Sequence, residues 1–338
     1  MSNDPLDPRA SGEFIAAHSE HVKLGPSSAI NAAVDLIVDK MASGEVEDTD
    51  WLEQELHPKT RDSAAVNWVL VVDALNFSFW SEPERKWQVA YKGKLWSGYF
   101  AACAAVNKAM DAGIPFLDPH YYGRISIEEL RSIFTGENGQ SIPLLAERQR
   151  ILHETAEALI QAFQGDFGNA VSEAGDSAQA LLSLVVRNFP SFRDVATFQG
   201  TKVSFYKRAQ ILVADIWRAL EKPYKDISSI TIFADYRVLA YLGVLDYDDV
   251  LKQRMERKEI LEAGCREEVE IRGLTIHACE EITKRLLSRL ESMGAKRPSC
   301  YAEVNAIVVD NFLWCYRRAN AKAVEASVPF HRTRTTFY

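Results

Sequence analysis

The sequence predicts a mainly α-helical protein, because apolar residues recur every three or four positions in most of its long segments. Pro, Gly and capping residues fall at the ends of these segments, where helices start and stop. Strand-like segments do not alternate with helical ones, which argues against a doubly wound fold, and no fixed-period repeat indicates a solenoid. We therefore expect a compact helical fold with at most one small β-sheet or hairpin.

Several segments carry this helical pattern. Segment 28–42 follows Pro26 and Ser27 and has an apolar residue on every helical turn, and Ser126 with Glu129 forms a capping box. In the segment 206–220 apolar residues recur every three or four positions, and Pro223 ends the predicted helix. Further helices are expected at 143–165, 267–297 and 301–318, in a short helix within 165–177, and in a helix ending near Gly113 whose inward stripe is Trp96, Tyr99, Cys103, Val106 and Met110.

Residues 68–80 (WVLVVDALNFSFW) are too rich in apolar and aromatic side chains for a surface helix, so we expect them to be buried. A β-hairpin is expected nearby, with FSFW (77–80) and KWQVAYKGK (86–94) as its strands and SEPER (81–85) as its turn.

The length of the chain allows one large domain or two small ones and does not by itself decide between them. The chain has 338 residues, of which 47% are hydrophobic and 25% charged, as in an ordinary globular protein. Residues 1–14, rich in Pro, Asp and Ser, are predicted to be a loose tail, and 15–338 a single domain that could divide into two helical lobes.

The net charge of −8, with no Lys/Arg-rich block, argues against binding to long DNA or RNA, although a few cationic side chains would suffice for one phosphate. The five cysteines form no CxxC pair, so a disulfide framework or a zinc site is not expected. No apolar run reaches the roughly 18 residues of a membrane span, and the N-terminus has no signal-peptide pattern. We expect a cytoplasmic protein.

Candidate site residues are carboxylates within apolar runs, because the common nucleotide-binding and hydrolase motifs are absent. Asp73, Asp235 and Asp310 each have strongly apolar sequence around them. A buried carboxylate needs a partner, which is either structural or a ligand. Burial alone favours the structural interpretation for any one of them.

Two cationic groups accompany these acids. Spacing alone favours solvated positions at the start of the helix 206–220 for Lys202, Lys207 and Arg208. Lys202 is the better ligand candidate of the three, because it precedes the helix in what we expect to be a loop. The C-terminal HRTRTTFY, with His331, is either a frayed end or a segment folded back over a site.

These strings together resemble the queuosine salvage protein family, the queuosine 5'-phosphate N-glycosylases/hydrolases. The likeness runs from about residue 15 to the C-terminus. It rests on WVLVVDALNFSFW, YKGKLWSGYFAACAAVNKAM, FQGTKVSFYKRAQILVADIW, ITIFADYRV with the following LGVLDY, VDNFLW and HRTRTTFY.

The resemblance implies a helical fold related to DNA glycosylases and hydrolysis of the bond between queuine and ribose in queuosine 5'-phosphate, for queuine salvage into tRNA modification. The glycine loop with which those relatives grip DNA is not found, which favours salvage over repair. The resemblance makes Asp235 the carboxylate at C1', with Asp310 as second choice. Lys202 is then a donor to ribose or phosphate, and Arg237, Tyr236 and His331 are further substrate contacts.

Queuine carries a secondary amine, expected to be cationic, linked to a cyclopentenediol. Asp73 with Asn76 is the expected acceptor for this group. Phe77, Trp96 and Tyr99 are expected to stack on or line the base, although core packing explains each of them equally well. The reaction implied needs no metal or organic cofactor, and a monomer is expected. The alternatives are a non-enzymatic helical module that binds a nucleotide or a protein, and a glycosylase acting on DNA.

Overall fold

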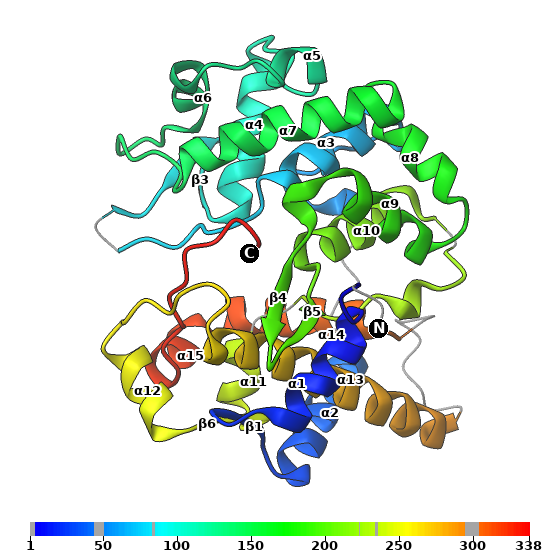
Figure 1. Cartoon of the computed structure of the whole chain (residues 1–338), viewed down its shortest axis with the longest axis vertical. Helices are drawn as coiled ribbons and strands as arrows, with labels where there is room; N and C mark the ends of the chain where they lie inside the picture. Colours follow the sequence, from blue (N-terminus) through cyan, green and yellow to red (C-terminus); the bar gives the residue numbers. More distant parts are fainter. Residues whose placement is uncertain (1–3, 44–50, 83–84, 223, 234–235, 295–303) are drawn as a thin grey trace. The chain divides into compact units, whose positions relative to one another are not determined.

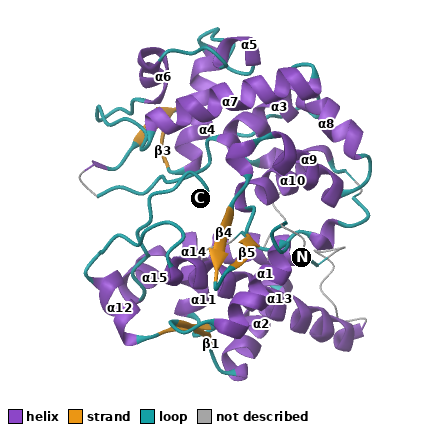
Figure 2. Ribbon diagram, viewed as in Figure 1, coloured by secondary structure: helices purple, strands orange, loops and turns teal. Residues whose placement is uncertain are grey.

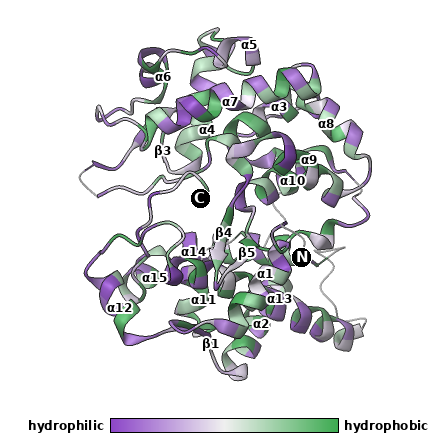
Figure 3. Cartoon of the chain, viewed as in Figure 1, coloured by the Kyte–Doolittle hydropathy of each residue, from purple (hydrophilic) through white to green (hydrophobic). Residues whose placement is uncertain are grey.

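Helices dominate the computed structural model, which describes residues 4–43, 51–82, 85–222, 224–233, 236–294 and 304–338 (Figures 1 and 2). Within those ranges the strands form three two-stranded antiparallel ribbons. Hydrophobic and hydrophilic residues mix along the helices, as helices with one buried face require (Figure 3). The mainly α prediction is confirmed, whereas the relation to DNA glycosylases stays a prediction.

The chain groups into two compact units. Unit 1 comprises Met1–Asp48, Val195–Phe205 and Ser228–Arg334, and unit 2 comprises Thr49–Asp194, Tyr206–Ile227 and Thr335–Tyr338. The single domain with two lobes stays a prediction.

Unit 1 is built on the 28-residue helix α13, Arg266–Met293. Its other helices are α1 (Pro8–His18), α2 (Ser27–Ala42), α11 (Tyr236–Tyr241), α12 (Asp249–Glu256), α14 (Ala306–Ala319) and α15 (Ala321–Ser327). Its strands are β1 (Val22–Leu24) paired with β6 (Leu245–Tyr247), and β4 (Val195–Phe198) paired with β5 (Thr201–Ser204).

Helices α1 and α2 lie against α13 (Figure 1). Two glycines allow α1 to approach closely: a Cβ on Gly273 would lie 2.6 Å from the Ile15 side chain, and one on Gly12 would lie 2.9 Å from Ile276 Cγ2. These distances are too short for real contacts, so the helix pair depends on both positions lacking a side chain.

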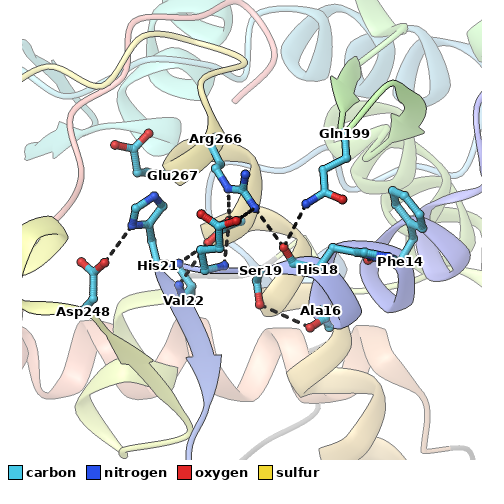
Figure 4. A network of polar contacts seen from close by, with 12 residues as sticks. Phe14, Ala16, His18, Ser19, His21, Val22, Gln199, Asp248, Arg266 and Glu267 are labelled. Carbon is cyan, nitrogen blue, oxygen red and sulfur yellow. Dashed lines mark hydrogen bonds and ion pairs between the residues drawn. The ribbon is translucent and has the colours of Figure 1, made fainter.

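A buried carboxylate fixes the chain between α1 and β1. Glu270 of α13 is fully buried and accepts the backbone N–H groups of Glu20, His21 and Val22, and Arg266 pairs with it at 2.8 Å. The His21 ring points to Asp248, the N-cap of α12, with Nδ1 and Oδ2 2.7 Å apart (Figure 4). Donors on all sides explain how the charge of Glu270 is tolerated in the core.

The N-terminal segment is more ordered than its composition predicts. Helix α1 begins at Pro8, with the Asp7 side chain accepting Ala10 N–H, so residues 8–14 of the predicted tail are helical. Leu6 pairs with Val203 of β5. Asp followed by Pro is a helix start signal, because Asp caps the first turn and proline fits position N1.

Unit 2 contains the remaining α-helices of the described residues: α3 (Ser63–Ala74), α4 (Tyr99–Asp111), α5 (Pro119–Tyr122), α6 (Ile127–Phe134), α7 (Leu145–Phe163), α8 (Phe167–Ala174), α9 (Ala178–Asn188) and α10 (Lys207–Leu220). Short 3-10 turns, η1 (Trp51–Glu53) and η3 (Pro190–Phe192), and the ribbon β2 (Gln88–Tyr91) with β3 (Lys94–Ser97) complete it. A further turn, η4 (Ile227–Ser229), spans the point where unit 2 passes into unit 1.

Helix α3 is the buried centre of unit 2, as residues 68–80 predict, and it packs against α10. Two buried arginines hold its C-terminal end. Arg148 donates to the carbonyls of Leu75 and Phe77, and Arg208 donates to Asp73 O at 3.3 Å and Ala74 O at 2.6 Å. The last carbonyls of a helix have no partner within it, and a guanidinium supplies several donors of the matching charge.

Several helix predictions are confirmed. The predicted segments 28–42, 143–165 and 206–220 match α2, α7 and α10, and the later ones match α8, α13 and α14. Ser126 and Glu129 form both hydrogen bonds of the capping box that starts α6. The helix predicted from Trp96 begins later, at Tyr99, because Trp96 lies in β3.

The hairpin prediction was right about one strand and wrong about the other. The strand 88–91 pairs with 94–97, and the turn is Lys92–Gly93, both with positive φ, rather than 81–85. Such a two-residue turn matches the twist of a hairpin. Residues 77–80 are not a strand, since the Phe77 carbonyl is bound by Arg148 and Ser78 adopts a φ of 44°.

Candidate active site

The predicted site residues divide between the two units. Asp73, Asn76, Phe77, Trp96 and Tyr99 belong to unit 2, whereas Lys202, Tyr236, Arg237, Asp310 and His331 belong to unit 1. Asp235, the predicted catalytic carboxylate, lies outside the described residues, and Tyr236 is the first residue of α11.

Asp73 lies at the C-terminal end of α3 and is 1% exposed. Asn76 follows Asp73 by three positions, and its Nδ2 lies 3.5 Å from Asp73 Oδ1. The structure therefore brings together the two residues expected to act together. Asp73 Oδ2 is buried and has no hydrogen-bond partner among the described residues. Burial, followed by the nearby charge of Asp215, raises the pKa of Asp73 well above its usual range.

Asp215 is a residue that the sequence reasoning missed. It lies on α10, is partly exposed, and its charge is one of the causes that raise the pKa of Asp73. Desolvation raises the pKa of Asp215 to about 7, against the opposing effects of Arg218 and Trp51. Its surroundings, QILVADIW, are as apolar as those of Asp73, so the same sequence criterion would have found it.

Tyr99 belongs to a hydrogen-bonded chain beside this acid pair. His57 Nδ1 lies 3.1 Å from the carbonyl of Trp51 and must therefore donate, which leaves Nε2 to accept from the Tyr99 hydroxyl at 3.2 Å. Burial lowers the pKa of His57 to about 4, so the ring is neutral near pH 7. Burial above all raises the pKa of Tyr99, and the Cys103 side chain on the same helix is a further polar partner of its hydroxyl.

Phe77 and Trp96 have other surroundings. Phe77 is 1% exposed, with the guanidinium carbons of Arg148 and Arg208 at 4.1 and 5.2 Å from its ring centre, a position that agrees with core packing. Trp96 is half-buried in β3, where its indole N–H donates to the Tyr91 carbonyl at 3.2 Å and its ring packs on Phe100.

In unit 1, Asp310 is 7% exposed on α14, and its Oδ1 accepts the backbone N–H of Phe233 at 3.2 Å. Phe233 stands two residues before Asp235 in the chain. Asp310 therefore fixes the segment that leads to the predicted catalytic residue.

Arg237 is buried and ties α11 to the end of α15. Its Nε and Nη2 donate to the Val328 carbonyl at 3.3 and 3.1 Å, and the guanidinium lies 5.4 Å from the Phe330 ring centre. His331 is buried one residue before Arg332, which pairs with Ile260. The C-terminal segment is thus ordered rather than frayed.

Lys202 lies in β5 opposite Thr197 of β4, not in the loop expected, and its side chain is exposed. Its carbonyl accepts the N–H of Leu6 at 3.0 Å, so the N-terminal segment holds this ribbon in place. Arg208, for which the sequence favoured a solvated position, is 1% exposed. Its partners are backbone carbonyls, which a helical pattern cannot reveal.

The arrangement offers a paired carboxylate system with aromatic neighbours in unit 2 and a second buried carboxylate in unit 1. Carboxylates of this kind can stabilise developing positive charge or bind a cation. Residues 56–338 match the family model described as "Queuosine salvage protein".

Similar proteins cover almost the whole chain. A protein of Bos taurus is 45% identical over 98% of this chain and 99% of its own, and one of Mus musculus is 46% identical over 99% of both. A protein of the bacterium Sphaerobacter thermophilus is 41% identical over 90% of this chain and 91% of its own. Each carries the name "Queuosine 5'-phosphate N-glycosylase/hydrolase". The chain belongs to the queuosine salvage protein family.

Proposed function

We propose that this protein hydrolyses the N-glycosidic bond of queuosine 5'-phosphate and releases queuine and ribose 5-phosphate, so that queuine is salvaged for tRNA modification. The observation that carries the proposal is the name shared by relatives that are 45% and 46% identical over nearly the full length of both chains. The same names favour an enzyme over a non-enzymatic binding module.

The chemistry needs a carboxylate near the sugar. As the bond between C1' and the base nitrogen breaks, its electron pair leaves with the base, positive charge develops on the ribose, and water adds its hydroxyl to C1' while a proton passes to the base. An anionic oxygen near C1' lowers this barrier. We assign this role to Asp235, and the bond between Asp310 and Phe233 N–H supports Asp310 as the residue that positions Asp235.

Cationic residues are proposed to bind the ribose and phosphate. Lys202 is an exposed residue of β5, and the point charge of a lysine suits a phosphate oxygen. Arg237 donates to the Val328 carbonyl, so we propose that it shapes the site around Tyr236 and His331.

Polar and aromatic side chains are proposed to contact the base. Asp73, Asn76 and Tyr99 supply polar groups, and Trp96 supplies an aromatic edge. For Phe77 we propose a role in core packing, because the guanidinium groups of Arg148 and Arg208 lie against its ring.

We further propose a cytoplasmic monomer that acts without a metal or organic cofactor and binds no nucleic acid polymer. The net charge of −8 supports a small substrate over a DNA duplex. Among the described helices, none is long and apolar enough to span a bilayer.

The test incubates the purified protein with queuosine 5'-phosphate and with queuosine, in the presence of a chelator, and measures released queuine by mass spectrometry. We expect release from the 5'-phosphate, and we expect Asp235→Asn to remove most turnover while the protein stays folded. Stabilisation by the nucleotide without release of base would support the binding module instead. Normal turnover by Asp235→Asn would refute the assignment of Asp235, and a strict metal requirement would refute the cofactor-free reaction.

A further inference from the structure

Unit 1 contains a cavity of about 500 Å³ that the proposed function does not use. Its walls are the ribbon β1–β6 with the two residues after β1, the end of α11, the second half of α12, and the stretch Ser327–Pro329. None of the described residues that we assign to the substrate or to catalysis lines it. A volume of this size is typical of a site for a small molecule.

Much of the cavity wall is apolar. Leu245 of β6 and Met255 of α12 are 3% and 2% exposed, so they belong to the buried core. Half-buried apolar side chains complete this part of the wall, namely Leu24, Ala240, Val328 and Pro329. A ligand with an apolar body would remove their remaining surface from water, which favours binding.

Four charged side chains line the same cavity. Lys23 of β1 lies opposite Asp246 of β6 in the ribbon, and Lys252 of α12 pairs with Asp246 at 2.9 Å. Lys252 therefore neutralises Asp246. The side chains of Lys23 and Glu256 form no ion pair or hydrogen bond with any residue that the structure describes. One ammonium and one carboxylate thus remain for a ligand.

These two charges come from different walls of the cavity. Lys23 lies on the ribbon, and Glu256 is the last residue of α12. They line one cavity without pairing with each other, so a ligand that contacts both must carry its own charges at separate ends. The apolar wall suits the part of the ligand between those ends.

We propose that this cavity binds a small zwitterion whose carboxylate and ammonium are joined by an aliphatic chain, as in an ω-amino acid. Lys23 binds the carboxylate, Glu256 binds the ammonium, and the apolar side chains contact the aliphatic chain. The site goes beyond the proposed function and does not depend on it.

Arg237 connects the cavity wall with α11. Its Nε and Nη2 donate to the carbonyl of Val328 at 3.3 and 3.1 Å, and Ala240 lines the cavity one helical turn after Arg237. A ligand in the cavity therefore contacts α11 and the segment that Arg237 holds. We expect the ligand to slow hydrogen exchange of the Gly243 N–H, which donates to the Ala240 carbonyl at 3.0 Å.

The experiment uses 6-aminohexanoate as the probe, with hexanoate and hexylamine as analogues that keep the chain and lose one charge each. Binding to the full-length protein is measured by ligand-observed NMR titration. We expect a dissociation constant on the order of 1 mM for 6-aminohexanoate. Each analogue should bind about five-fold more weakly, because it forms one ion pair fewer at a solvent-exposed residue.

Two variants separate the two ends of the site. Lys23→Met should remove the advantage of 6-aminohexanoate over hexylamine, and Glu256→Gln should remove its advantage over hexanoate. The matched controls are Lys284→Met and Glu291→Gln at exposed positions of α13, which do not line the cavity and should leave all three constants unchanged. Ser327→Trp, which adds a bulky ring to the cavity wall, should abolish binding of all three probes.

Equal binding of the three probes, no detectable binding, or constants that Lys23→Met and Glu256→Gln leave unchanged would overturn the proposal. Displacement of 6-aminohexanoate by queuine together with ribose 5-phosphate would also overturn it, since the cavity would then belong to the substrate site. Every measurement here is of binding or exchange, so a failure of the proposed hydrolase reaction would leave these outcomes unaffected.

Discussion

The buried guanidinium of Arg208 should be a principal support of unit 2, and Arg208→Met tests this. The substitution keeps an extended side chain but removes every donor. Three buried carbonyls, those of Asp73, Ala74 and Ser191, then lose their partner, at about 1–3 kcal/mol each. Burial, opposed by the charges of Asp194, Asp73 and Glu154, lowers the pKa of Arg208 to about 10. This net shift corresponds to about 3 kcal/mol against the charged guanidinium, which methionine does not incur. The difference is a net loss of about 3 kcal/mol in the free energy of unfolding.

The assay is urea unfolding followed by tryptophan fluorescence, with hydrogen exchange of the amides at 73–78 as a local measure. The control is Arg187→Met on α9, whose side chain is 70% exposed and should contribute less than about 0.5 kcal/mol. A loss below about 1 kcal/mol in Arg208→Met, with unchanged exchange at the end of α3, would refute the reasoning.

Three further predictions concern other parts of the fold. Asp248, more than any other group, raises the pKa of His21, so His21 stabilises the protein at low pH and loses this effect as the pH rises through the folded-state pKa. His21→Gln should therefore lower stability by about 0.5–1 kcal/mol at pH 6 and by almost nothing at pH 9, and thermal melts showing an equal effect at both would contradict it. Gly273→Ala should lower the free energy of unfolding by about 2–3 kcal/mol, because its Cβ would lie 2.6 Å from the Ile15 side chain. In a double-mutant cycle followed by urea unfolding, Ile15→Ala should lessen this loss, and additive losses would count against the contact. Ser126→Ala removes the cap of α6 and should lower the free energy of unfolding by about 1 kcal/mol, measured as a shift of the urea midpoint. Ser126→Asn should restore the wild-type midpoint. An unchanged midpoint in Ser126→Ala would argue that the capping box is dispensable.

Local signals explain what the sequence predicted correctly. Helices α2, α6 and α10 depend on apolar spacing, a capping box and a terminating Pro or Gly, all of which act within a few residues. The burial of Asp73 follows from its immediate neighbours in the same way.

Contacts between distant segments explain what the sequence did not predict. Arg208 was expected at the surface because all three of its acceptors are backbone carbonyls, which a sequence pattern does not reveal, and two of them belong to residues more than a hundred positions earlier. The hairpin register depends on Lys92 adopting a left-handed conformation, which its residue type does not indicate. The influence of Asp215 on Asp73 could not be predicted from the sequence, because it depends on the packing of α10 against α3.

The close approach of Gly12 to α13 has a consequence for synthesis of the chain. Helix α1 leaves the ribosome long before Gly273, which is its neighbour in the finished protein. At about 5–20 residues per second, translation of the roughly 250 intervening residues takes about 13–50 s. During that interval the side chain of Ile15 lacks α13, the helix against which it packs in the folded protein. We expect the nascent N-terminal segment to be a preferred client of ribosome-associated chaperones, with release timed by the emergence of α13.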